Sequence, residues 1–425
     1  MTKRWSFLLA LVLVCTINGI AMAKTTVTHF HYSGHGPAWH EYLVERAEIF
    51  NATHPDIEVQ VMVSGSSSEY ITKFTVMLAG GTPPDVTDFH PALGAPYIID
   101  GTFEDLTPYL QRDGIDLLRA TSPAVMSVLS TNTGGVWGLP ADIFPVVTFY
   151  NEELFDKAGL RYPKDLGNEW NWEQVIASAR KLTVDANGDG TPEQWGVDRM
   201  WARWYMWIHQ TGHQLYDRVI DPTKSYWNDP HVAQGLEFPL SMMLEGIATK
   251  PNTPGVAQTY FWFGRMGMSL VDGPGSIGAY LREKPFAYNI APQVRGPVNA
   301  GTEITVDAYE MISTSSNKDA AWEWMKFISL DVDSHARFVE LTGRAPSLAQ
   351  LQRRYQQLCP YLPSNYMAFF EATAAAGTQT NYIHRDASAV NAVINPLINQ
   401  IFTGAIPIQT AAAQIHEQVS AILAQ

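Results

Sequence analysis

The sequence is poor in cysteine, with only Cys15 and Cys359 among 425 residues. Cys15 falls in an amino-terminal segment that we expect to be removed, so Cys359 has no partner for an internal disulfide. An unpaired thiol is a hazard in an oxidising compartment, and Cys359 is therefore expected to be buried. Basic residues are also scarce, with 28 against 42 acidic residues and a net charge of −14. Such a chain lacks the clustered cations that a nucleic-acid backbone requires, which excludes nucleic acid as the main partner.

Long apolar runs are absent after the amino terminus, where residues 1–23 have the pattern of a secretory signal peptide. A basic start at Lys3 precedes an apolar core over 7–14 and the cleavage site Ala21-Met-Ala23. A lipoprotein signal would need a small residue before its cysteine, and Val14 stands there instead. We therefore expect cleavage rather than a lipid anchor. No later run has 18 uninterrupted apolar residues, so no membrane span is expected and the predicted location is the periplasm.

Common hydrolase and metalloprotease motifs are missing too. The sequence contains no G-x-S-x-G, and His40-Glu41 lacks the second histidine of H-E-x-x-H. The 12 histidines are scattered, and the nearest set is His29, His31 and His35. His29 and His31 share one face of a predicted strand, where hydrogen-bonded strand histidines are a better interpretation than a metal site. We expect neither a catalytic residue, a metal nor a cofactor.

What the sequence does contain is the composition of a globular protein, with 46% hydrophobic residues and a mean hydropathy of −0.10. Its length suits two or three domains, or two large lobes. Strand-like alternation over 25–32 and 57–63 brackets a helical pattern over 37–51. The same rhythm recurs in a helix over 69–79 and a short strand over 86–89. Alternating strands and helices of these lengths predict an α/β sheet covered by helices.

In such sheets the ligand crevice lies beyond the carboxyl ends of the strands. The loops over 33–37, 64–68 and 88–94 are therefore expected to share one edge. Further along, helices are predicted over 172–182, 230–246 and 318–330, and a strand over 266–271. After Pro346 the chain is predicted to be largely helical.

Tryptophan is concentrated between Trp137 and Trp262, which contains nine of the 13 tryptophans. Trp201, Trp204 and Trp207 would share one face of a helix. Sugar sites pair a stacking ring with polar side chains, although tryptophans at this spacing also build cores. We expect one or two of them to line a cleft and the others to pack.

Two loops resemble ligand motifs only in part. Asp185-Ala-Asn-Gly-Asp189-Gly190 matches the first half of a calcium loop, but Gly196 stands where the bidentate Glu is required. A turn rich in side-chain hydrogen bonds is the alternative, and the sequence leaves calcium binding open. Gly273-Pro-Gly275 spells the start of a dinucleotide fingerprint far from the amino-terminal strand unit. It is better interpreted as a glycine turn that presents helix-start amides to a cleft.

Seven motifs in a fixed order give a family resemblance. Together they resemble extracellular solute-binding proteins of family 1, the sugar-binding proteins of ABC importers, a group that includes the maltose-binding proteins. The resemblance spans nearly the whole chain after residue 23. The motifs start at Ala79-Gly-Gly-Thr-Pro-Pro-Asp85, Gly101-Thr-Phe-Glu-Asp, Gly135-Val-Trp-Gly-Leu-Pro140 with Phe149-Tyr-Asn-Glu-Glu-Leu-Phe155, Trp172-Glu173, Phe263-Gly-Arg-Met-Gly with Asp272-Gly-Pro274, Ile312-Ser-Thr-Ser-Ser-Asn317, and Gly343-Arg-Ala-Pro-Ser347.

The resemblance implies a periplasmic-binding-protein-like α/β fold, with two lobes joined by three crossing strands and a ligand cleft between them. The implied first lobe is 24–141 plus about 288–327, and the second is about 142–287 plus 328–425. Many relatives carry tryptophan after the Gly-Pro of the Asp272 motif, where this chain has Gly275, so Trp204 or Trp262 would have to replace that ring. The implied ligand-binding residues are Asp88, His90, Asp142, Trp201, Trp204, Trp262, Gly275 and Arg344.

The resulting hypothesis is a monomeric periplasmic binding protein that closes on a carbohydrate and delivers it to ABC permease subunits. A glycerol phosphodiester or sugar phosphate is the second candidate ligand, because Gly275 cannot stack on a sugar. An exported glycoside hydrolase or lyase and a surface adhesin are rival classes. The sequence does not identify the sugar, its linkage, or any chemoreceptor partner.

Overall fold

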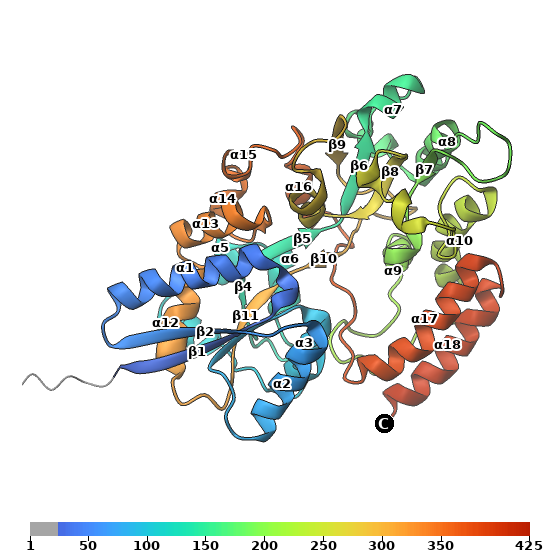
Figure 1. Cartoon of the computed structure of the whole chain (residues 1–425). Coiled ribbons are helices and arrows are strands. Elements are labelled where there is room, and N and C mark those ends of the chain that lie inside the picture. The colour runs from blue at the N-terminus through green and yellow to red at the C-terminus, as the bar shows by residue number, and fades with distance from the viewer. Residues whose placement is uncertain (1–23) are drawn as a thin grey trace, which may run out of the picture.

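The protein has an α/β fold with two large sheets joined by a short third sheet (Figure 1). The computed structural model describes residues 24–425, and the signal peptide expected at residues 1–23 lies outside them. The strands are β1 (Thr25–His31), β2 (Ile57–Val63), β3 (Val86–Phe89), β4 (Leu139–Pro140), β5 (Asp142–Pro145), β6 (Val147–Asn151), β7 (Trp195–Val197), β8 (Met266–Asp272), β9 (Tyr288–Ala291), β10 (Ile304–Thr305), β11 (Ala308–Met311) and β12 (Ala345–Pro346).

Helices cover both large sheets, and short single-turn segments link them. The α-helices are α1 (Pro37–Thr53), α2 (Ser67–Ala79), α3 (Pro91–Ile99), α4 (Thr107–Arg112), α5 (Leu117–Ala120), α6 (Pro123–Leu129), α7 (Glu152–Lys157), α8 (Trp172–Leu182), α9 (Trp204–His209), α10 (Pro230–Glu245), α11 (Pro274–Ser276), α12 (Lys318–Ser329), α13 (Val332–Thr342), α14 (Ala349–Gln352), α15 (Tyr355–Leu358), α16 (Ala368–Ala374), α17 (Ala387–Thr403) and α18 (Ile408–Leu423). The short segments are η1 (Ser33–His35), η2 (Pro163–Asp165), η3 (Gly167–Glu169), η4 (Met200–Arg203), η5 (Val256–Thr259), η6 (Phe261–Phe263) and η7 (Ile277–Leu281).

The first lobe is built on the five-stranded sheet with the order β2-β1-β3-β11-β4. β1 pairs in parallel with β2 and β3, whereas β11 is antiparallel to β3 and β4. The strands and helices predicted for residues 25–89 are present, with bounds that differ by no more than two residues. The loops at the carboxyl ends of β1 and β2 are in contact, because Ser33 Oγ donates a 3.1 Å hydrogen bond to Gly65 O.

The second lobe is built on the four-stranded sheet with the order β7-β8-β6-β9. Its core includes side chains from α8, α9, α10, α17 and α18, so the carboxyl-terminal helices complete this lobe (Figure 1). The predicted helices over 172–182 and 230–246 correspond to α8 and α10. α8 begins where the sequence predicts, because Asn171 caps it by accepting a hydrogen bond from Gln174 N at 3.0 Å.

A three-stranded sheet, β10-β5-β12, lies between the lobes. The chain passes from β4 of the first sheet through β5 to β6 of the second. It returns from β9 through β10 to β11, and β12 pairs with β5. β5 and β10 thus lie on the two connections between the large sheets, and β12 adds a third strand to the linking sheet. The three crossing strands that the family resemblance implies stay a prediction.

Two elements pack against a different lobe from the one to which the predicted boundaries assign them. β9 pairs with β6 of the second sheet, and α13 packs on α1 of the first lobe. The exact lobe boundaries stay a prediction.

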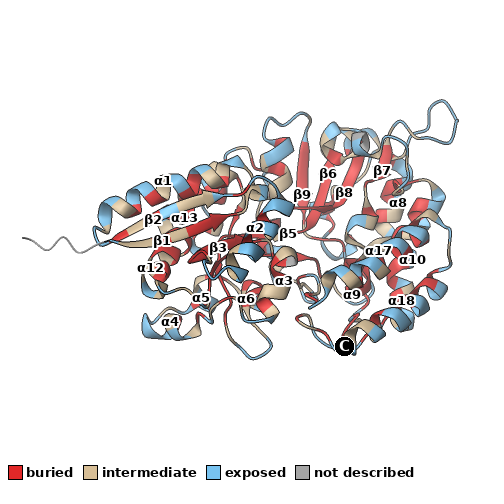
Figure 2. Ribbon diagram, turned by 60° about the horizontal axis from the view of Figure 1, so that its bottom comes forward, coloured by how far each residue is buried: buried red, intermediate tan, exposed pale blue. Residues whose placement is uncertain are grey.

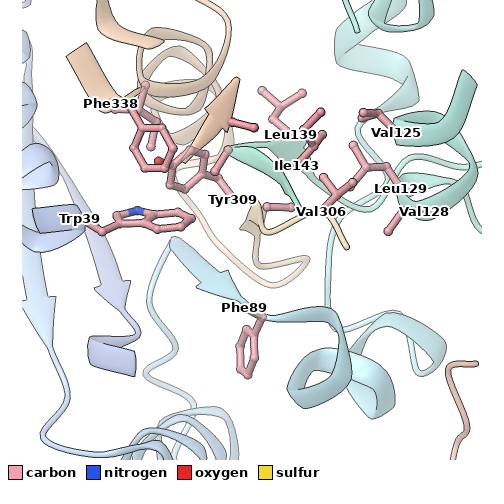
Figure 3. Packing of buried hydrophobic residues seen from close by; sticks show 14 of the residues in the cluster. Trp39, Phe89, Val125, Val128, Leu129, Leu139, Ile143, Val306, Tyr309 and Phe338 are labelled. Atoms are coloured by element: carbon pink, nitrogen blue, oxygen red, sulfur yellow. The ribbon is translucent and has the colours of Figure 1, made fainter. Parts of the chain in front are cut away.

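Aromatic side chains join the first-lobe helices to its sheet. Trp39 of α1 is fully buried and makes edge-on contacts with Phe338 of α13 and Tyr309 of β11, with ring centroids 4.7 and 6.0 Å apart (Figure 3). Buried residues lie along the strands of both large sheets and on parts of the helices that cover them (Figure 2). Cys359 is one of them, as expected, and burial raises the pKa of its thiol to about 11. Within residues 24–425, no helix combines the length and apolar character that crossing a bilayer requires.

Candidate functional site

A cavity of about 410 Å³ opens between the lobes at the carboxyl ends of β1 and β3. This is the edge at which open α/β sheets bind ligands, and the volume lies within the range of small-molecule sites. A larger hollow of about 760 Å³ begins at Thr25, at the opposite end of β1, and its charged residues include the ion pair of Arg112 with Asp319. We therefore take the interlobe cavity as the candidate site. Its lining residues are Tyr32, Gly34, His35, His90, Leu93, Phe144, Arg203, Thr305, Asp307 and Arg344.

Arg344 lines the cavity and is paired with two carboxylates. α13 ends at Thr342, and the left-handed φ of +70° at the following Gly343 turns the chain into Arg344. Its Nη1 atom donates to Asp142 Oδ2 at 2.6 Å and to Asp307 Oδ2 at 2.8 Å. The guanidinium also lies 4.8 Å from the centroid of the buried Trp39 ring.

The Arg344 guanidinium thus donates hydrogen bonds to two buried carboxylates, those of Asp142 and Asp307. Burial raises the pKa of Asp142 and of Asp307, and Arg344 opposes this rise in both. Because like charges in one low-dielectric site disfavour joint ionisation, the pair holds a proton more readily than free carboxylates do. The cluster can therefore donate as well as accept hydrogen bonds.

His35 connects this cluster to the first lobe. Its ring stacks on Trp39 with centroids 4.1 Å apart, and its Nδ1 atom lies 3.5 Å from Asp307 Oδ2. Burial lowers the pKa of His35 well below its ordinary value, so the ring is neutral. Among the described residues, neither His35 Nε2 nor Asp307 Oδ1 has a hydrogen-bond partner, although both atoms are buried; His35 Nε2 lies 3.7 Å from Asp88 Oδ1, beyond hydrogen-bond distance. Buried polar atoms without partners carry a desolvation cost that a ligand hydroxyl would remove.

Asp88, a predicted ligand-binding residue, is fully buried and does not line the cavity. Its Oδ2 atom bonds to His29 Nε2 at 3.1 Å and His31 Nδ1 at 2.8 Å, while Oδ1 accepts from Tyr32 N at 2.7 Å. Burial alone would raise the pKa of Asp88, but the neighbouring histidines more than offset this and lower it. Asp88 thus fixes the loop that carries Tyr32 and His35, and His29 and His31 are the hydrogen-bonded strand histidines that the sequence suggested.

His90 follows β3 directly and lines the cavity as predicted. Burial lowers its pKa, which keeps the imidazole neutral. Arg203, from the second lobe, faces the same space and forms an ion pair with Glu303 just before β10. Its guanidinium lies 5.8 Å from the centroid of the Phe144 ring. The cavity wall therefore combines neutral histidines, aromatic rings and cations that are already paired.

Trp201 and Trp204 lie elsewhere. With Pro251 and Phe402 they line a separate hollow of about 310 Å³ against α17, while Trp207 is completely buried in the second core. Trp201 and Trp204 therefore share one hollow, as neighbours on one face would, whereas Trp207 does not continue that face.

Trp262 and Gly275 are also set back from the interlobe cavity. Trp262 stacks on Tyr280 with centroids 4.1 Å apart and lies 5.2 Å from the Arg199 guanidinium. Gly275 lies behind Phe144, and a Cβ atom added there would come within 3.0 Å of that ring. The small residue that replaces the family's tryptophan therefore leaves room for Phe144.

Sequence reasoning missed several cavity residues, namely Tyr32, His35, Phe144, Arg203, Thr305 and Asp307. His35 lies in the 33–37 loop that was predicted at the edge of the sheet where ligands bind, and Arg203 lies between Trp201 and Trp204. Their positions in the sequence could therefore have indicated both residues. Asp307 and Phe144 had none, because they lie in or beside short linking strands without a motif. The Asp185 loop is an exposed turn in which Asp185 accepts from Gly188 N and Gly190 N at 2.9 Å each.

These features define a class of two-lobed binding proteins with a ligand site at the lobe interface. The sequence profile of the bacterial extracellular solute-binding protein family matches residues 32–331, and the chain belongs to that family. Membership implies a location outside the cytoplasm, periplasmic or extracellular.

Curated relatives and solved structures agree with this assignment. A binding protein of Brucella abortus (strain 2308) is 26% identical over 320 residues, which cover 72% of each chain. An arabinooligosaccharide-binding protein of Bacillus subtilis is 24% identical over 164 residues, 38% of this chain and 36% of the relative. A Listeria monocytogenes ABC substrate-binding protein solved in complex with cycloalternan superposes with a TM-score of 0.76 at 21% identity, covering 94% of this chain and 99% of that one. The sugar-binding protein from Xanthomonas citri gives 0.77 at 18% identity, covering 94% and 98%.

Proposed function

We propose that this protein is the periplasmic substrate-binding component of an ABC importer and that it binds an uncharged carbohydrate between its lobes. The observation that carries this proposal is the pairing of charges in the cavity. Arg203 pairs with Glu303, and Arg344 pairs with both Asp142 and Asp307. Two cations therefore face three carboxylates, which leaves no unpaired cation for a phosphate. The arrangement disfavours the glycerol phosphodiester or sugar phosphate that the sequence left open.

The cavity offers what a sugar requires. His35 Nε2 and Asp307 Oδ1 are unpartnered polar atoms for hydroxyl groups, and Phe144 and Tyr32 are aromatic side chains for the apolar C–H face. The relatives named for arabinooligosaccharide and cycloalternan support the same ligand class.

The residues that line the cavity come from both lobes, and this supports binding by domain closure. Tyr32 and His90 come from the first lobe, Arg203 from the second, and Phe144 from β5 between them. A ligand that contacts both lobes binds the closed arrangement more tightly and shifts the population towards it. The ligand is then released unchanged to the permease, so we propose no enzymatic step.

A thermal-shift panel tests the ligand class. Neutral oligosaccharides should raise the melting temperature because they bind only the folded state, whereas glycerol phosphodiesters and sugar phosphates should not. Titration calorimetry with the best sugar should give one site, and small-angle scattering should show a smaller radius of gyration in its presence. Exclusive binding of the phosphorylated compounds would contradict the proposal.

Product analysis separates binding from catalysis. The bound sugar should be recovered intact after prolonged incubation with the protein. Turnover of more than one equivalent would favour the hydrolase or lyase class instead. Attachment to cells without any small-molecule ligand would favour an adhesin.

A further inference from the structure

We propose that His213, Asp229 and His231 form a binding site for a divalent transition-metal ion of the Zn²⁺ type. This group lies outside the interlobe cavity, in the second lobe. Each residue offers one ligand atom, and these atoms all lie within 4.8 Å of one another. Within residues 24–425 it is the one group of three histidine, cysteine or acidic side chains that meets this condition.

The distances suit an ion of this size. Tetrahedral zinc with bonds of about 2.0–2.1 Å places neighbouring ligand atoms about 3.3 Å apart. His213 Nδ1 lies 3.7 Å from Asp229 Oδ1, and His231 Nδ1 lies 2.7 Å from the same oxygen. Because the three ligand atoms already lie within 4.8 Å of one another, small side-chain rotations would bring them to bonding distance.

The backbone holds two of the three side chains in place. Asp229 caps the amino terminus of α10, and its Oδ1 atom accepts a 2.9 Å hydrogen bond from His231 N. His213 follows α9 and places Nε2 3.4 Å from Tyr226 O. That contact uses Nε2 and leaves Nδ1 available, the arrangement in which the second nitrogen of a metal-bound histidine is hydrogen-bonded to a backbone carbonyl.

The chemistry of the group selects the ion. Two imidazoles and one carboxylate suit Zn²⁺, Ni²⁺ or Cu²⁺, whereas Ca²⁺ and Mg²⁺ prefer all-oxygen sites. The side chain of His231 is 54% exposed and that of His213 is 16% exposed, so an ion can enter from solvent on one side. Three protein ligands leave a fourth position for water.

A bound ion would connect two packed helices. α9 contacts α10 along its length, and Trp207 makes an edge-on contact with Phe238 at 5.4 Å. The ion would tie the segment that follows α9 to the amino terminus of α10. Arg203, which lines the cavity, directly precedes α9. Metal binding would therefore stabilise the second-lobe segment that carries this residue.

Calorimetry with ZnCl₂ on tag-free, chelator-treated protein tests the site. We expect one equivalent of Zn²⁺ to bind. His213→Gln and His231→Gln should each lose more than about tenfold in affinity, because even the loss of a ligand's hydrogen-bond partner costs 10–100-fold. Asp229→Asn retains a capping oxygen and should also weaken binding. His54→Gln, in the first lobe, is the matched control and should bind as the parent does.

Two outcomes would overturn the proposal, namely no saturable binding to the parent protein or unchanged affinity in all three site variants. The visible spectrum of the parent protein with Co²⁺ provides a test that needs no variant. Absorption of tetrahedral, nitrogen-ligated Co²⁺ supports the site, and an octahedral aquo-type spectrum contradicts it. The melting temperature should rise with Zn²⁺ in the parent protein and stay constant in His213→Gln.

Discussion

Arg344 donates a 2.6 Å hydrogen bond to Asp142, a residue 202 positions earlier in the chain. The contact joins the turn after α13 to the first residue of β5, which leads from the first lobe to the second. Arg344 also neutralises Asp307, so one side chain holds together the part of the cavity nearest to the linking strands.

Replacing Arg344 should therefore destabilise the fold. Arg344→Met leaves two buried carboxylates without a cation, and the free energy of unfolding should fall by about 3–5 kcal/mol in urea titrations. Arg344→Met combined with Asp142→Asn should recover part of this loss, because one buried charge is removed. Arg282→Met is the control, since its guanidinium lies over Tyr361 near the surface. Equal losses in Arg344→Met and Arg282→Met would contradict the assigned role of the pair.

His35 should matter for affinity more than for stability. His35→Gln removes the ring that faces the cavity, and it should weaken sugar binding by about 1–3 kcal/mol in calorimetry because a desolvated hydrogen bond is lost. His54→Gln carries the same chemical change outside the cavity and should bind normally. An unchanged affinity for His35→Gln, with ligand bound at one equivalent, would remove His35 from the site.

Phe144, rather than Trp204, should provide the stacking surface. Phe144→Ala should raise the dissociation constant at least about tenfold, since an aromatic contact and its buried area are lost. Trp204→Leu should leave affinity unchanged and reduce the stability of the second lobe. If calorimetry shows that Trp204→Leu weakens sugar binding and Phe144→Ala does not, Trp204 is the stacking residue, as the sequence suggested.

Stability should fall on acidification from pH 6.5 to about pH 4. Burial lowers the pKa of His335 and of His384 to about 4, whereas unfolded histidines titrate near 6.5. In this window the unfolded chain binds more protons than the folded one, so the free energy of unfolding decreases as the pH decreases.

His335 is the clearest test of this effect. Its Nδ1 atom bonds to Ser329 O at 2.9 Å and its Nε2 atom accepts from Ser347 N at 3.2 Å, so the neutral ring is the form that fits. His335→Gln should lower stability at pH 7 but flatten its decline below pH 6.5, as measured by urea unfolding at several pH values. If the free energy of unfolding of His335→Gln falls with decreasing pH as steeply as that of the parent protein, other groups cause the decline.

Local patterns made much of the fold predictable. Alternation over Thr25–His31 and Ile57–Val63 gave the strands, and the cap at Asn171 and the left-handed Gly246 lie at the ends of predicted helices. Each of these signals depends on neighbouring residues, which interact in the same way in any fold that contains the segment. The change from η4 to α9 and the short linking strands were not predictable, because no local signal in the sequence marks them.

The sequence by itself determined the α/β elements, the family and the edge of the first sheet at which the interlobe cavity opens. His90 and Arg344 could be assigned to the cavity because they directly follow, or belong to, recognisable motifs. Only the tertiary structure decided that Asp88 lies behind the cavity lining, that Phe144 and none of the expected tryptophans lines the cavity, and that Arg203 and Arg344 are already paired with carboxylates. The physical reason is that charge neutralisation and exposure depend on residues 37 to 202 positions apart, and no local pattern records which of them meet.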